Sequence, residues 1–85
     1  MKKTMTRNCF RVTKDGVTYE FEAAGEGGYV VSVPLYPSCV SEGDTFEGAL
    51  ENIEDALKEC LMAARDLNLN IPKELMHVIR QPATT

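Results

Sequence analysis

The sequence lacks the residue patterns that most catalytic and metal sites require. Its 85 residues contain one histidine, His77, and three cysteines without a CxxC or CxxH spacing. A histidine acts in catalysis only beside a positioned partner, and short cysteine spacings are typical of zinc sites. Glycine-rich phosphate loops and G-x-S-x-G elbows are also missing. We therefore expect a protein that is not an enzyme, with no catalytic residue, metal or cofactor.

The chain also lacks a long apolar run. Its first residues, MKKT, resemble the basic start of a signal peptide, but the next twelve, MTRNCFRVTKDG, contain no apolar core of the length that such a peptide needs. No segment is long enough to span a bilayer. Because the cysteine number is odd and no disulfide framework is indicated, we expect reduced thiols in a cytoplasmic protein.

Basic residues are scarce and scattered. The chain has 9 of them against 13 acidic residues, with a net charge of −4, and no basic run exceeds the pair Lys2-Lys3. Direct nucleic-acid binding needs a basic face that neutralises phosphates, so we expect neither a nucleic-acid nor a membrane partner. A basic protein partner suits this charge better.

The length and the hydrophobic content of 44% indicate one domain over residues 1–85, with flexible ends at 1–7 and 81–85. A chain this short buries a limited core. We therefore expect a homodimer or a higher homo-oligomer, in which a second copy covers part of the surface.

Alternating apolar and polar residues predict three strands in the first half of the chain, over residues 8–13, 17–22 and 29–33. The pair Asp15-Gly16 supplies the positive φ angles of a tight hairpin turn between the first two. Together with the helix described below, the pattern predicts an α+β fold: a three- to four-stranded antiparallel sheet with one long helix on one face.

The connection over residues 34–44 is longer than the 4 to 6 residues that are usual in compact domains. A short edge strand over residues 39–42 would explain part of its length. Tyr36 follows no period and lies between prolines, which is typical of a contact anchor, although simple packing of the loop explains it equally well. Cys39 is interpreted as a small apolar residue beneath the loop, because no cation near it would activate a thiolate.

Apolar residues then recur at steps of three and four over about five turns, which predicts a helix that begins at Asp44 or Thr45, with Thr45 favoured. The apolar positions are Phe46, Ala49, Leu50, Ile53, Leu57, Cys60, Leu61 and Ala64. The opposite face is acidic, with Glu47, Glu51, Glu54, Asp55 and Glu59 beside Lys58. Of these, Glu54 and Lys58 have the spacing of a favourable pair. Residues 75–80, which include His77, are predicted to return as a last strand.

The run GGYVVSVPLYPSCVSEGDTFEGALENIEDAL resembles the HicB family of antitoxins and its single-domain relatives of the UPF0150 type. The shared pattern is a strand that ends in valine-proline, a loop with a cysteine, and a G-D-T step into an alanine- and leucine-rich helix. The matching residues are Gly27, Gly28, Tyr29, Val33, Pro34, Pro37, Cys39, Val40, Glu42, Gly43, Asp44, Thr45, Ala49, Leu50, Asn52 and Ala56. The sequence departs from the pattern at Leu35, Ser38 and Gly48.

This resemblance implies a β-β-β-α-β fold, a partial ribonuclease H-like sheet with one helix. It also implies neutralisation of a small basic HicA-type toxin that cleaves mRNA. No helix-turn-helix or ribbon-helix-helix segment follows the helix, so operator binding is not expected. The ribonuclease carboxylate set is not recognisable.

We therefore expect a partner-binding surface made of Leu35, Tyr36, Glu42, Asp44, Glu51 and Asp55. Four residues are expected to maintain the local structure of the motif: Pro34, Cys39, Gly43 and Thr45. Leu35 and Tyr36 would be apolar anchors, the acids would steer association, and Gly43 would let the loop turn into the helix. Two alternatives stay open: an orphan domain that oligomerises or binds a small ligand, and a vestigial nuclease whose carboxylates would hold a metal.

Overall fold

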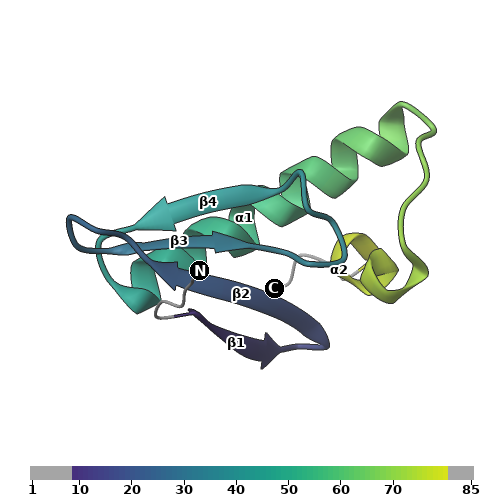
Figure 1. Cartoon of the computed structure of the whole chain (residues 1–85). Coiled ribbons are helices and arrows are strands. Elements are labelled where there is room, and N and C mark those ends of the chain that lie inside the picture. Colours follow the sequence, from purple (N-terminus) through teal and green to yellow (C-terminus); the bar gives the residue numbers. More distant parts are fainter. Residues whose placement is uncertain (1–8, 81–85) are drawn as a thin grey trace, which may run out of the picture.

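The computed structural model describes residues 9–80 as a four-stranded antiparallel sheet with a long helix on one face (Figure 1). The elements are β1 (Cys9–Lys14), β2 (Val17–Ala23), β3 (Tyr29–Ser32), β4 (Val40–Gly43), α1 (Phe46–Asp66), a 3-10 turn (Lys73–Leu75) and α2 (Met76–Arg80). The strands are hydrogen-bonded in the order β1-β2-β3-β4. The α+β prediction is confirmed with four strands. The predicted flexible ends at 1–7 and 81–85 lie outside the described residues.

The first hairpin forms where the sequence predicts it. Asp15 and Gly16 have φ angles of 53° and 79°, the left-handed values that a two-residue hairpin turn requires. The resulting register pairs Phe10 with Phe21 and Val12 with Tyr19. Paired residues lie on the same face of an antiparallel sheet, so the apolar sets of both strands face the same side.

The long connection after β3 contains the expected edge strand, displaced by one residue at each end. The prediction was residues 39–42, and β4 covers Val40–Gly43. The remaining loop is stabilised by its own backbone: the Tyr36 N–H donates to the Val33 carbonyl at 2.8 Å, and the Cys39 N–H donates to the Tyr36 carbonyl at 2.9 Å. The length of the connection therefore comes from a strand and a compact double turn.

Thr45 is the N-cap of α1, as predicted, because its Oγ1 accepts a hydrogen bond from the Gly48 N–H at 3.0 Å. The helix ends in a Schellman motif. Asn68 takes a left-handed φ of 58°, and the Leu69 N–H donates to the Ala64 carbonyl at 2.8 Å. This arrangement satisfies carbonyls that the end of a helix would otherwise leave without partners.

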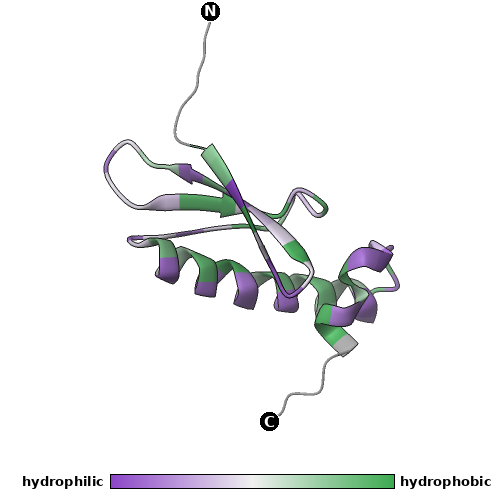
Figure 2. Cartoon of the chain, turned by 90° about the horizontal axis from the view of Figure 1, so that it is seen from below, coloured by the Kyte–Doolittle hydropathy of each residue, from purple (hydrophilic) through white to green (hydrophobic). Residues whose placement is uncertain are grey.

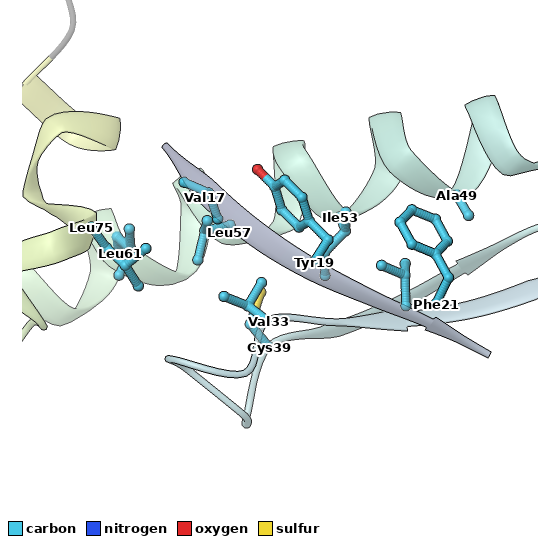
Figure 3. Close-up of a cluster of buried hydrophobic side chains, with 11 residues drawn as sticks. Val17, Tyr19, Phe21, Val33, Cys39, Ala49, Ile53, Leu57, Leu61 and Leu75 are labelled. Atoms are coloured by element: carbon cyan, nitrogen blue, oxygen red, sulfur yellow. The ribbon is translucent and has the colours of Figure 1, made fainter. Parts of the chain in front are cut away.

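The core lies between α1 and the sheet face that carries Tyr19 and Phe21, and α1 packs mainly over β3 and β4 (Figures 1 and 3). Buried residues of α1 contact buried residues of β2, β3 and the following loop. The buried cluster consists of Val17, Tyr19, Phe21, Val31, Val33, Cys39, Ala49, Ile53, Leu57, Leu61 and Leu75. We call this side of the sheet the covered face.

The predicted last strand over residues 75–80 is wrong, because these residues form the end of the 3-10 turn and α2. Leu75 is fully buried in the core cluster, and Val78 and Ile79 pack against it. Their spacing of three and four places them on one side of a helix, whereas a strand would have separated them onto two faces. Figure 3 shows Leu75 beside Leu61 of α1. Helical packing against α1 therefore decides the conformation of this segment.

The other side of the sheet, which we call the open face, is not covered by any helix of residues 9–80 (Figure 2). By strand alternation it is formed by Cys9, Arg11, Thr13, Thr18, Glu20, Glu22, Val30, Ser32, Val40 and Glu42. Val30 and Val40 are 37% and 54% exposed. The open face is thus polar with two exposed valines.

Candidate partner-binding site

The predicted surface residues do not form one continuous site. Leu35 and Tyr36 lie in the loop before β4, whereas Glu42 and Asp44 lie at the opposite end of that strand, where the chain enters α1. In Figure 1 these two connections are at opposite ends of the sheet. Glu51 and Asp55 are both exposed on α1. The structure therefore separates the apolar anchors from the acidic loop residues and leaves the helix acids as a third group.

The two loop residues differ in exposure. Leu35 is 47% exposed, as a contact anchor would be. Tyr36 is half-buried and packs against the core cluster, while its backbone forms the double turn described above. Packing of the loop thus explains the position of the Tyr36 side chain. Leu35 is the apolar side chain that is more accessible to a partner.

At the other end of β4, a polar cavity of about 390 Å³ is lined by Glu42, Asp44 and Asn52, among other residues. The Asn52 side-chain amide donates to the Glu42 carbonyl oxygen at 2.7 Å. This bond connects α1 to β4 and gives Asn52 a structural role that its position in the sequence motif did not reveal.

Gly43 has a different role from the predicted one. Its φ angle is not in the left-handed region, but a Cβ at this position would lie 2.4 Å from the Ala49 backbone nitrogen. Only a residue without a side chain lets β4 approach α1 so closely.

Cys39 is 1% exposed, which agrees with a small apolar residue beneath the loop. Burial raises the pKa of its thiol to about 12, with a smaller contribution from Cys60.

The outer side of α1 carries hydrophilic residues on successive turns in Figure 2, whereas the last turns also expose Met62. The carboxylates Glu47, Glu51, Asp55 and Glu59 are exposed there. The predicted pair of Glu54 with Lys58 is replaced by another: Glu54 Oε2 lies 2.9 Å from the Lys14 Nζ of β1. This hydrogen bond and the charge of Glu54 raise the pKa of Lys14. Lys14 pairs only with Glu54, so the four carboxylates on the outer side remain available for contact with a partner.

A second cavity, of about 260 Å³, lies between the β1–β2 turn, α1 and α2 and was not predicted from the sequence. Its lining includes Tyr19, Asp15, Asp55, Lys58 and His77. The His77 Nε2 lies 2.7 Å from the Asp15 carbonyl oxygen and donates a hydrogen bond to it, because a carbonyl can only accept. His77 therefore joins α2 to the hairpin turn, so the lone histidine has a packing role.

No known family model matches this chain. Likewise, no solved structure matches it. Two curated relatives do match: the UPF0150 protein Ta0767 of Thermoplasma acidophilum and the UPF0150 protein ssr1765 of Synechocystis, each 37% identical to this chain over 49 residues. The match covers 58% of this chain, 71% of the first relative and 62% of the second. The chain belongs to the UPF0150 family.

In this UPF0150 protein, residues 9–80 contain no group of three or more His, Cys, Asp or Glu side chains that could hold a metal ion. No helix in the same range combines the length and apolar composition needed to cross a membrane. The features that do distinguish the described surface of this UPF0150 chain are the acidic side of α1, the exposed Leu35 and the two cavities.

Proposed function

We propose that this UPF0150 protein is a HicB-like antitoxin that binds and neutralises a small basic HicA-type toxin, an mRNA-cleaving protein, and has no enzymatic activity of its own. The main support is the charge of the residues that the structure describes. Residues 9–80 contain all 13 acidic residues and six of the basic ones. A surface with this excess of carboxylates attracts a basic protein and repels nucleic acid.

The exposed acids of α1 are the best-placed contacts for such a partner. Glu51 and Asp55 lie on a rigid helix that is fixed by a capped N-terminus and by its packing on the sheet. Because the helix backbone is already ordered, binding has to order only the side chains. In the proposed complex they accelerate association, while the exposed Leu35 contributes apolar contact.

A second candidate function is an orphan HicB-like domain, which forms oligomers or binds a small ligand without a toxin. The exposure of Val30 and Val40 on the open face supports it, because a second copy could cover these valines. A homodimer or higher homo-oligomer is part of both proposals, and both place the protein in the cytoplasm. Neither involves direct contact with nucleic acid or with a membrane.

Co-expression with a small basic protein encoded beside this gene, followed by size-exclusion chromatography and calorimetry, tests the antitoxin function. We expect a stoichiometric complex in which RNA cleavage by the partner is suppressed. Absence of a complex at micromolar concentrations would contradict the antitoxin function and favour the orphan domain.

A charge-reversal experiment tests which surface is used. The triple variant Glu51→Lys, Asp55→Lys, Glu59→Lys should lower the association rate by about tenfold or more and reduce its dependence on salt. The matched control reverses three exposed acids elsewhere, Glu22, Glu26 and Glu74, with the same change in net charge. Equal losses in both variants would show that net charge, and not the side of α1, steers the partner.

A further inference from the structure

The cavity between the β1–β2 turn, α1 and α2 contains a buried polar group with no partner in the described part of the chain. Tyr19 is 3% exposed, and its ring is part of the core cluster. Its hydroxyl points away from Val33 and Cys39 in Figure 3, and the residue lines the cavity. The hydrogen bonds among the described side chains do not include this hydroxyl.

A buried hydroxyl without a partner is unfavourable, and most such groups in proteins are hydrogen-bonded. Burial, with smaller contributions from Glu54 and Asp15, raises the pKa of Tyr19 to about 12. The phenol is therefore neutral at physiological pH and can both donate and accept. A polar group that enters the cavity would provide the missing hydrogen bond.

The charges around the cavity favour a cationic guest. Three carboxylates, those of Asp15, Glu54 and Asp55, line it with one ammonium group, that of Lys58. Glu54 is paired with Lys14, whereas no ion pair within residues 9–80 involves Asp15 or Asp55. The cavity thus offers two carboxylates and a phenol oxygen as acceptors.

The size of the cavity favours a single side chain. Its volume of about 260 Å³ lies just below the range usual for small-molecule sites, about 300 to 1,000 Å³. A guanidinium group has five N–H donors in a planar fork, and it loses less hydration energy on burial than an ammonium group. Arginine side chains in desolvated pockets are also frequent energetic centres of protein interfaces.

We propose that this cavity, which we call the Tyr19 pocket, binds an arginine side chain of the basic partner, with the guanidinium group on the Tyr19 hydroxyl and the Asp15 and Asp55 carboxylates. The inference rests on the proposed antitoxin function and names the contact that the partner makes. Asp55 belongs both to the pocket and to the acidic side of α1. An arginine can therefore enter the pocket while neighbouring basic residues of the same partner contact the helix.

The pocket can be tested without the partner. N-acetyl-arginine amide is titrated into the full chain and followed by two-dimensional NMR of the backbone amides around Gly16 and His77. We expect saturable shifts at probe concentrations below about 10 mM. N-acetyl-citrulline amide, a neutral analogue of the same shape, and N-acetyl-lysine amide should bind at least fivefold more weakly. Equal binding of the lysine or citrulline probe would overturn the assignment to arginine, and so would a lack of localised shifts.

Two variants probe the chemistry of the pocket. Tyr19→Phe removes only the hydroxyl and Asp55→Asn only a charge, and each should weaken binding of the arginine probe about 5- to 10-fold. Glu20→Gln is the matched control, because Glu20 follows Tyr19 on β2 and lies on the open face. Thermal unfolding checks the fold: Tyr19→Phe should unfold at the same or a higher temperature, so that a loss of binding reports on the hydroxyl. Unchanged probe binding by Tyr19→Phe would overturn the proposal.

The same variants separate this inference from the proposed function. If the toxin binds Tyr19→Phe as tightly as the original protein, the pocket contact is overturned and the antitoxin function stands. If the arginine probe binds but no basic toxin does, the antitoxin function is overturned and the pocket stands as a guanidinium site. Weaker toxin binding by Tyr19→Phe, with normal binding by Glu20→Gln, supports both.

Discussion

The covered and open faces of the sheet are built from the same strands but have opposite characters. On the covered face, β1, β2 and β3 place aromatic and aliphatic side chains under α1. Phe10 stacks on Phe21, and Phe46 is tilted against both, with ring centroids 4.8 to 6.0 Å apart. On the open face the alternate residues are acids, hydroxyls, Arg11, Cys9 and two exposed valines. Because burial is confined to the covered face, we expect substitutions there to lower stability far more than substitutions on the open face.

The largest expected effect comes from the centre of the covered face. Phe21→Ala should lower the free energy of unfolding by about 3 to 5 kcal/mol, because it leaves a cavity where a fully buried ring stood. Its neighbour Glu22 is exposed on the open face, and Glu22→Ala should change stability by less than about 0.5 kcal/mol. Urea unfolding of both variants measures the difference. Similar losses in the two would refute the contrast between the faces.

Alkaline pH should lower the free energy of unfolding by ionising Tyr19 and Cys39, two buried residues of the core. The folded state raises the pKa of Tyr19 from 10.0 to about 12 and that of Cys39 from 9.0 to about 12. Unfolding then releases protons, so stability is complete below pH 9 and falls as the pH rises toward 12. The Tyr19 part alone is about 2 to 3 kcal/mol. Urea unfolding from pH 8 to 11.5 should show this decline, with a shallower slope above pH 10 in Tyr19→Phe. A flat profile would contradict it.

A third prediction concerns the close packing of β4 against α1. Gly43→Ala places a methyl group against the backbone at Ala49, so the helix must shift, at an expected cost of about 1 to 3 kcal/mol. Gly25→Ala is the matched control, because nothing lies within 4 Å of a Cβ there and its φ angle is not in the left-handed region. Thermal unfolding of the two variants compares them. A loss confined to Gly43→Ala would confirm that close packing requires this glycine.

The smallest expected effect belongs to an ion pair on the open face. Arg11 Nη2 lies 3.2 Å from Glu20 Oε1, with side chains 64% and 37% exposed. Exposed pairs of this kind contribute little, so Arg11→Ala should lower the free energy of unfolding by less than about 1 kcal/mol. Added salt should reduce that difference further. A larger loss that persists in 1 M salt would show that Arg11 has a packing role as well.

Much of the fold follows from local patterns, and the errors have physical causes. Strand alternation, the Asp15-Gly16 turn and the Thr45 cap are properties of short segments, so the sequence predicts them. The prediction for residues 75–80 was wrong because six residues are too few for periodicity to distinguish a strand from a helix. Packing of Leu75, Val78 and Ile79 against the core selects the helix. The sequence predicts one continuous surface, but the structure separates its residues, since Leu35 and Asp44 lie at opposite ends of β4.

The sequence by itself determined the three alternating strands, the amphipathic helix with its acidic side, and the excess of negative charge, because each depends on residue type and spacing alone. The tertiary structure decided which face of the sheet the helix covers, that Gly43 is needed for close packing, and that Tyr19, Asp15, Asp55 and His77 line one pocket. These last features join segments up to 62 residues apart, as in the bond from His77 to Asp15. Such contacts exist only once the helix and the hairpin pack together, and no local pattern encodes them.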